Sequence, residues 1–214
     1  RQFTTLGENI IALEVDGTFD DCQEMVKSAF VDPELKENIK LTSANSINIA
    51  RWLSQMFYYF IAYKNRPNPD KKIVFSVPSG NFGNICAGII AKQMGLPIDH
   101  FVASTNINDT VPEFLKSGSY TPKKSIQTIS NAMDVGNPSN FIRIQEIFNN
   151  DFFKLKKVLS SFGYTDKLTK KALKEIFKIN GYIADPHGAI GFLGLKQYMA
   201  SLKNEEAYQG IFLE

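Results

Sequence analysis

The segment Ser79-Gly80-Asn81-Phe82-Gly83-Asn84 combines two glycines with two asparagines, residue types that suit the binding of an anion. An apolar run at 73–77 comes before it and predicts a strand, and a stretch over about 84–94 follows it and predicts a helix. At a helix N-terminus the backbone N–H groups are unpaired and the helix dipole is positive, so this position favours a phosphate.

The side chains of this loop support the same interpretation. Gly80 and Gly83 let the main chain approach a phosphate closely, and Asn81 and Asn84 supply side-chain donors. The alternative is an ordinary turn between a strand and a helix, with a glycine in the left-handed conformation.

The spacing of the glycines limits which phosphate the loop binds. A dinucleotide site would need Gly-x-Gly-x-x-Gly and an acidic residue at the end of the second strand. Here the spacing is Gly-x-x-Gly, and the strand predicted next ends in Ser104-Thr105-Asn106. A Walker loop would need Gly-Lys followed by Ser or Thr, which this loop lacks. We therefore expect neither a dinucleotide nor a nucleoside triphosphate.

Further polar residues are candidates for binding a substrate. Asn48, Arg51 and Gln55 have the spacing of one face of a helix predicted from Asn45 or Ser46 to about Tyr63. Arg51 suits a phosphate or carboxylate, but an ion pair across the domain explains the stripe equally well. The apolar side of that helix is expected in the core and consists of Ile47, Ala50, Leu53, Phe57, Phe60 and Ile61.

Asn106 follows the carboxyl end of a strand, where ligands bind in open parallel sheets. Asp109 or Thr110 is expected to cap the next helix. Asp185-Pro186 predicts the start of the last long helix, and a catalytic role for the following His187 is the alternative. His100 is expected at the surface.

The predicted elements form an α/β fold. The strand at 73–77, the following helix and a strand at 100–104 make a βαβ unit, which implies a parallel sheet. Another strand is predicted at 10–15, before a helix that ends at Asp32-Pro33. More helices are expected over 110–117, 138–149, 152–161, 168–179 and 187–202, and a strand at 210–213.

The composition fits a globular protein without a nucleic-acid surface. Of the 214 residues 43% are hydrophobic, and the net charge is only +2. Eight lysines in 154–178 alternate with apolar residues at helical spacing, which predicts solvated helix faces. Cys22 and Cys86 are expected as core residues in a reducing cytoplasm, without a disulfide or a metal. No apolar run reaches the roughly 20 residues of a membrane span.

Several stretches, taken in order, resemble the threonine synthase family, and the resemblance covers nearly the whole chain. The segment 79–84 is similar to the family's loop for the phosphate of pyridoxal 5'-phosphate (PLP). The other similar stretches are Leu13-Glu14-Val15-Asp16-Gly17-Thr18-Phe19-Asp20-Asp21-Cys22, Ser43-Ala44-Asn45-Ser46-Ile47-Asn48, Thr105-Asn106-Ile107-Asn108-Asp109-Thr110-Val111-Pro112, Ser130-Asn131-Ala132-Met133-Asp134-Val135 and Asp185-Pro186-His187. No role is assigned to Asn131 or Asp134.

The resemblance implies a fold type II PLP enzyme, like the tryptophan synthase β chain. Such an enzyme is a carbon–oxygen lyase that converts O-phospho-L-homoserine and water into L-threonine and phosphate. It implies that Gly80, Asn81, Phe82, Gly83 and Asn84 bind the cofactor, and that Asn48, Arg51 and Asn106 are candidates for the substrate. We expect 41–214 to be the large domain, a parallel sheet flanked by helices, and 1–40 to be a remnant of the smaller, mobile domain.

The resemblance also implies that two functional elements lie outside this sequence. The family's Schiff-base lysine precedes the stretch matched by Arg1, and its Thr-Ala-His-Pro stretch follows Glu214. We therefore expect both ends to be cut, no catalytic residue within 1–214, and no activity from this chain alone.

Two other functions stay open at this point. One is a non-catalytic α/β module that binds a phosphorylated metabolite or a nucleotide. The other is a different fold type II enzyme, such as a threonine dehydratase or a cysteine synthase. The stretches at 106–112 and 133–135 argue against the second.

Overall fold

The structure is a computed structural model that describes residues 7–46 and 48–214. It divides into two compact units, Arg1–Leu41 and Thr42–Glu214. Ile47, which was expected on the apolar side of a helix, lies outside the described residues.

The first unit is helical where the sequence predicts a helix, but it lacks the predicted strand. Helix α1 (Phe19–Val31) begins at a capping box in which Thr18 and Asp21 satisfy each other's backbone N–H groups. Helix α2 (Pro33–Asn38) follows. The strand predicted at 10–15 is wrong: Ile11 and Leu13 are 83% and 85% exposed, and no strand pairs with this stretch in the described part of the chain. Cys22, which was expected in a core, is only half-buried.

The second unit is built on a four-stranded parallel sheet with the order β3-β2-β1-β4. The βαβ unit is confirmed, because β1 (Lys72–Pro78) pairs in parallel with β2 (His100–Thr105). The other strands are β3 (Leu159–Gly163) and β4 (Tyr208–Phe212). The carboxyl ends of β1 and β2 lie side by side, with Pro78 opposite Ser104.

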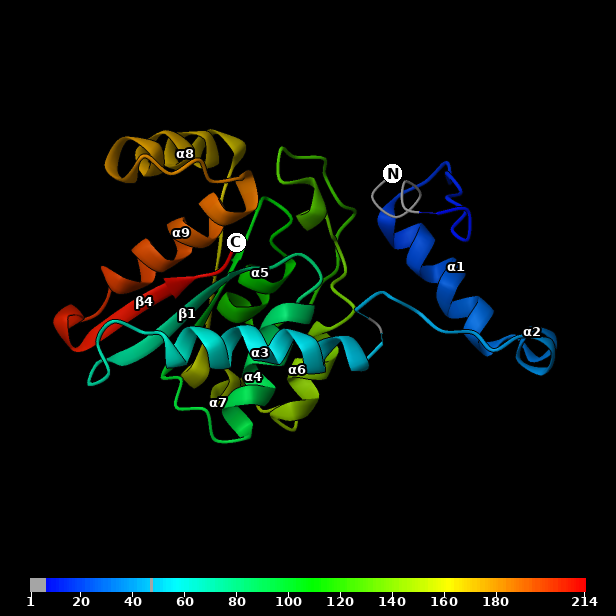
Figure 1. Cartoon of the computed structure of the whole chain (residues 1–214), viewed down its shortest axis with the longest axis horizontal. Coiled ribbons are helices and arrows are strands. Elements are labelled where there is room, and N and C mark those ends of the chain that lie inside the picture. Colours follow the sequence, from blue (N-terminus) through cyan, green and yellow to red (C-terminus); the bar gives the residue numbers. More distant parts are fainter. Residues whose placement is uncertain (1–6, 47) are drawn as a thin grey trace. The chain divides into compact units, whose positions relative to one another are not determined.

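Helices cover both faces of this sheet (Figure 1). Helix α9 (Pro186–Met199) packs against β1 and β2, and α8 (Asp166–Asn180) packs on α9. On the other face α4 (Gly83–Gln93) lies between the sheet and α3 (Ala50–Lys64). The remaining elements are α5 (Thr110–Ser117), α6 (Phe141–Ile147), α7 (Phe152–Val158) and the short 3-10 turns η1 (Asn131–Met133) and η2 (Glu205–Ala207).

Three aromatic rings fix α3 and α4 on the sheet. Tyr59 of α3 is fully buried, and its ring meets those of Phe75 and Phe101 edge to face, with centroids 4.9 and 5.9 Å apart. Gly88 of α4 makes room for that ring, because a Cβ atom there would lie 2.4 Å from Cζ of Tyr59.

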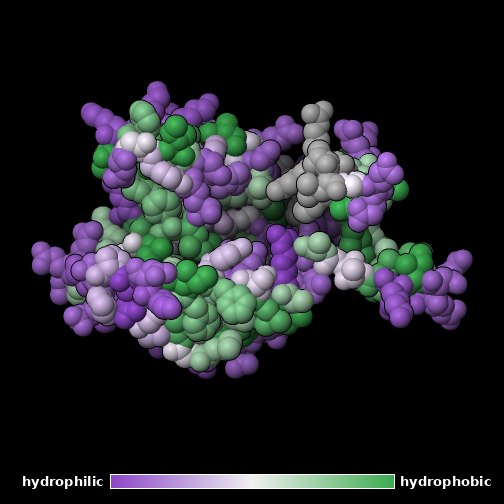
Figure 2. Space-filling view, in the orientation of Figure 1, coloured by the Kyte–Doolittle hydropathy of each residue, from purple (hydrophilic) through white to green (hydrophobic). Residues whose placement is uncertain are grey.

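The buried face of α3 differs from the predicted one. Trp52, Met56 and Tyr59 are buried, whereas Leu53 and Phe57, expected in the core, are 59% and 62% exposed. Figure 2 shows hydrophobic residues on the surface where α3 lies. The helix is apolar almost all round, so its periodicity alone does not identify the face that packs on α4.

The segment 152–161, predicted as one helix, changes to a strand. Helix α7 ends at Val158, and Leu159–Gly163 pairs with β2 as an edge strand of the sheet. The eight lysines of 154–178 are all exposed, which confirms the predicted solvated faces. In the described parts of the chain, no helix has the length and hydrophobicity needed to span a membrane.

Candidate functional site

The predicted anion-binding loop connects the carboxyl end of β1 to the N-terminus of α4. Its left-handed residue is Phe82, with φ 61° and ψ 14°, and not a glycine. This conformation is strained for a bulky residue and is found mainly where the surrounding structure enforces it, often at functional sites. The Phe82 ring is buried and packs edge to face on Phe141, with centroids 5.5 Å apart.

The backbone N–H groups of this loop are free to bind an anion. Ser79 N donates to Ser104 O at 2.8 Å and Cys86 N donates to Phe82 O at 3.1 Å. Between them, the N–H groups from Gly80 to Ile85 have no acceptor among residues 7–46 and 48–214. The first turn of α4 contains no acidic residue that would repel an anion. These features meet the requirements of a phosphate site at a helix N-terminus.

The side chain of Asn81 binds neighbouring segments of the protein. Its Oδ1 accepts from Ser139 N at 2.6 Å and from Ser139 Oγ at 3.0 Å, and its Nδ2 donates to Ser46 Oγ at 3.1 Å. Asn140 Nδ2 donates both to Ser46 Oγ and to the Asn81 carbonyl oxygen, each at 3.0 Å. Three segments distant in sequence thus meet at the loop. One hydrogen-bonded cluster at the loop therefore contains Ser46, Asn81, Ser139 and Asn140.

The sequence did not identify Ser46, Ser139 and Asn140 as part of this site. The helix was expected to start at Asn45 or Ser46, but α3 begins at Ala50 without a side-chain cap. Polar residues before a helix are common, and only the tertiary fold brings these three to the loop.

The two glycines of the loop are needed for close packing. A Cβ atom on Gly80 would lie 2.8 Å from Ala132 O and from Met133 Cα. A Cβ atom on Gly83 would lie 2.9 Å from Cβ of Ser46. Both glycines therefore let neighbouring chain segments approach the loop, in addition to any role toward a ligand.

Asn84 is bound by the buried residue Tyr59. The Tyr59 hydroxyl donates to Asn84 Oδ1 at 2.6 Å and lies 3.1 Å from the Asn84 carbonyl oxygen. Burial, and to a lesser degree the nearby Cys86, raise the pKa of Tyr59 well above 10, so its hydroxyl keeps its proton. Because Oδ1 is engaged, the amide nitrogen of Asn84 is the atom that remains available to a ligand.

Asn48 and Arg51 both make local hydrogen bonds before and within the first turn of α3. Arg51 is exposed, and its Nη1 donates to Ala44 O at 3.1 Å. Asn48 Nδ2 donates to Ser43 O at 2.9 Å, and its Oδ1 accepts from Ala50 N at 3.1 Å. Arg51 forms no ion pair with an acid in the described residues, so the structural alternative of a pair across the domain finds no support.

Asn106 lies inside a buried polar network. It has no exposed surface, and its Nδ2 lies 2.8 Å from Asp134 Oδ1 and 2.9 Å from Thr128 Oγ1. Its Oδ1 accepts from Asn108 N and Nδ2, each at 2.9 Å. The network engages both polar atoms of the Asn106 side chain, and Asp134 is part of it.

The two histidines lie in different surroundings. The expectation that His100 is a surface residue is wrong: it is 6% exposed, stacks on Tyr198 with centroids 4.4 Å apart, and contacts Ser160 Oγ through Nε2 at 2.9 Å. Its burial lowers its pKa to about 4. His187 stands at the predicted helix start, where Asp185 accepts from the N–H groups of His187 and Gly188.

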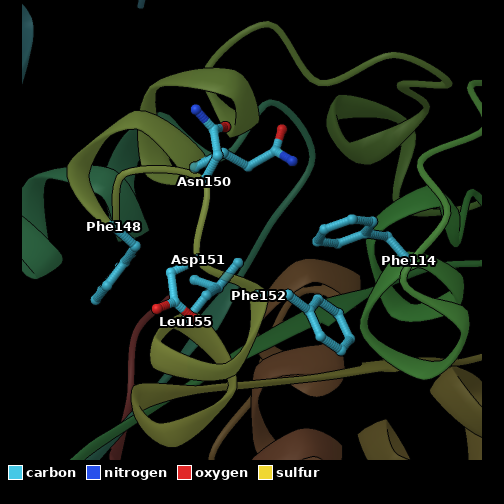
Figure 3. Close-up of a pocket in the computed structure, with 7 residues that line it drawn as sticks. Phe114, Phe148, Asn150, Asp151, Phe152 and Leu155 are labelled. Atoms are coloured by element: carbon cyan, nitrogen blue, oxygen red, sulfur yellow. The ribbon is translucent and has the colours of Figure 1, made fainter.

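A small hollow between α5, α6 and α7 lies apart from this loop (Figure 3). It is lined mainly by apolar side chains, and its polar residues shape the chain between α6 and α7. Asp151 caps α7 by accepting from Lys154 N at 2.9 Å, and Asn150 has a left-handed φ of 57°. None of the residues that line the hollow belongs to the loop at 79–84.

Comparisons with known proteins identify the family of the chain. A family profile described as "Pyridoxal-phosphate dependent enzyme" matches residues 1–209. Threonine synthase from Buchnera aphidicola subsp. Schizaphis graminum is 50% identical over 213 residues, which are 99% of this chain and 48% of that protein.

Two solved structures are similar to the chain. The structure of threonine synthase from Escherichia coli matches with a TM-score of 0.89 and 43% identity, over 98% of this chain and 48% of that one. PLP-bound threonine synthase from Brucella melitensis matches with a TM-score of 0.78 and 33% identity, over 92% and 47%. The chain thus spans about half the length of these relatives.

Proposed function

Because the chain belongs to the pyridoxal-phosphate dependent enzyme family, we propose that the whole protein is a threonine synthase. It would convert O-phospho-L-homoserine and water into L-threonine and phosphate, in the cytoplasm. The observation that carries this proposal is 50% identity to a threonine synthase along 99% of the chain.

The loop at 79–84 fits the phosphate group of PLP. The free N–H groups from Gly80 to Ile85, the N-terminus of α4 and the amide nitrogen of Asn84 supply donors, and no carboxylate in the first turn of α4 opposes the anion. We propose that Gly80, Asn81, Phe82, Gly83 and Asn84 hold this phosphate, with Asn81 acting through its backbone. Bound PLP withdraws electrons from an amino acid attached to it, which assists the loss of phosphate and the addition of water.

The substrate carries a phosphate and a carboxylate of its own. Of the three candidate residues Asn48, Arg51 and Asn106, Arg51 is the best suited to bind one of these groups. Its guanidinium is exposed and uses Nη1 for the carbonyl oxygen of Ala44, so its other donors are available to an anion. Asn48 would act by fixing the turn that precedes Arg51. Asn106 stays a prediction that its burial does not favour.

The test uses the full-length protein with PLP. We expect the visible absorbance of bound PLP, and release of phosphate with formation of L-threonine from O-phospho-L-homoserine. Reduction with borohydride followed by mass mapping should place the cofactor on a lysine outside 1–214.

Three outcomes contradict the proposal in different ways. PLP binding with turnover of threonine or serine, but not of O-phospho-L-homoserine, indicates another fold type II lyase. Binding of phosphorylated metabolites without turnover indicates a non-catalytic module. A reduced adduct on a lysine within 1–214 overturns the assignment of the catalytic lysine.

A further inference from the structure

Asn140, the residue before α6, is fully buried and uses its side-chain amide completely on the phosphate-binding loop and its surroundings. Its Nδ2 donates to the Asn81 carbonyl oxygen and to Ser46 Oγ, each at 3.0 Å. Its Oδ1 accepts from Arg143 Nη1 at 3.0 Å. The hydrogen bond to the backbone of Asn81 is what links Asn140 to anion binding.

This hydrogen bond sets the direction of one free N–H group. The carbonyl oxygen of Asn81 and the N–H of Phe82 belong to the same planar trans peptide, so they point in opposite directions. When Asn140 holds the carbonyl oxygen in the interior, the N–H of Phe82 must point away from the interior. Phe82 is also the strained residue, with φ 61°, so its backbone would relax if this bond were lost.

The orientation of the Asn140 amide is itself fixed. Arg143 donates to Asn140 Oδ1 and, through the same nitrogen, to the Ser46 carbonyl oxygen at 3.2 Å. Its guanidinium also stacks over the ring of Trp52, 4.7 Å from the ring centroid. A reversed amide would bring its NH₂ group against these Arg143 donors, so the donors of Asn140 face the loop.

We propose that Asn140 is a positioning residue for the cofactor, one that orients the Asn81–Phe82 peptide for the phosphate of PLP. The inference rests on the proposed function. The alternative is a purely structural role, in which Asn140 stabilises the fold but does not affect the affinity for PLP.

Asn140→Asp in the full-length protein tests the proposal, because it keeps the shape and the acceptor for Arg143 but removes both donors. Asn140→Ser removes the same donors without adding charge. Ser161→Ala is the matched control, since it removes a buried hydrogen bond, Ser161 Oγ to Ala103 O at 2.7 Å, from β3. Each apo protein is titrated with PLP and separately with inorganic phosphate, and its urea midpoint is measured.

We expect both Asn140 variants to bind PLP and inorganic phosphate about 10-fold or more weakly, the effect of roughly one well-placed hydrogen bond. Ser161→Ala should change these affinities less than about twofold, although it lowers the urea midpoint comparably. The weaker binding should appear in the uncharged Asn140→Ser variant as well as in Asn140→Asp, because it comes from peptide orientation and not from the charge of Asp.

The failures of the two proposals are distinguishable. If the wild-type protein binds neither PLP nor phosphate, the proposed function fails and the inference fails with it. If the wild type binds PLP and both Asn140 variants bind it equally well, only the inference is overturned. Loss of affinity in Asn140→Asp but not in Asn140→Ser also overturns it, because charge then explains the effect.

Discussion

Replacement of Gly88 by alanine tests how firmly the helix that begins at the phosphate-binding loop is held against α3. A Cβ atom at position 88 would lie 2.4 Å from Cζ and 2.5 Å from Cε1 of Tyr59, and 2.8 Å from Cε1 of Phe101. All three distances are far shorter than van der Waals contact, so either a ring or α4 must move.

The sign of the effect follows from two opposing terms. In a helix interior, Gly→Ala stabilises a protein by about 1 kcal/mol through helix propensity. Overpacking of a tight core costs about 1–3 kcal/mol. We expect the overpacking cost to lie at the upper end of this range, because the Tyr59 ring cannot easily move: it packs on Phe75 and Phe101. Its hydroxyl is also bonded to Asn84. The predicted net result for Gly88→Ala is a loss of about 2 kcal/mol in the free energy of unfolding.

Urea unfolding of the wild type, Gly88→Ala, Tyr59→Leu and the double variant measures this collision as a coupling energy. In the Tyr59→Leu background Gly88→Ala should cost less, because the Tyr59 ring is gone and only the close approach to Phe101 Cε1 at 2.8 Å remains. An increase in stability of Gly88→Ala in the wild-type background would refute the argument. An equal cost in both backgrounds would refute it as well.

The remaining predictions concern the buried polar groups. Tyr59→Phe removes the hydroxyl that binds Asn84 and should lower the free energy of unfolding by about 1 kcal/mol in urea. Burial lowers the pKa of His100 to about 4. Between that value and the usual 6.5, His100 binds a proton in the unfolded chain but not in the folded protein. The stability that the neutral, buried His100 contributes is therefore complete above about pH 6.5 and is lost as the pH falls toward 4. Urea unfolding across this range should show the loss in the wild type and a flatter profile in His100→Phe. Asp134→Asn weakens the network around Asn106 and should destabilise the protein by about 2 kcal/mol with little change in KM; a raised KM at unchanged stability would instead place Asn106 at the substrate.

Features encoded in contiguous residues were predicted well from the sequence. The apolar run before Pro78 and the glycines after it identify the strand, the loop and the start of α4. Asp185-Pro186 marks the first turn of α9, with Asp185 as the observed cap. In these cases the backbone signal and the tertiary environment favour the same structure.

Features that depend on distant partners were not predictable in this way. The residues Leu159–Gly163 continue an apolar helical pattern, and only pairing with β2 makes them a strand. Helix α3 carries apolar side chains on several of its faces. Contact with α4 therefore decides that Trp52 and Tyr59 are buried while Phe57 is exposed. Nothing near Asn140 in the sequence indicates that its amide binds Asn81.

Contacts with distant parts of the chain also decide which groups of the loop can recognise a ligand. Asn81 and Asn106 were both expected to contact ligands through their side chains, yet those side chains bind other parts of the protein. Among the described residues, the donors that the loop leaves free are the side-chain amide nitrogen of Asn84 and the backbone N–H groups from Gly80 to Ile85. Every sequence provides backbone N–H groups, and only a particular backbone conformation directs them at one anion. Affinity for a phosphate at this loop should therefore depend less on the donors of its side chains than on the residues that fix its backbone. Asn140 fixes the Asn81–Phe82 peptide by a hydrogen bond, and Gly83 does so by admitting Ser46 close to the helix.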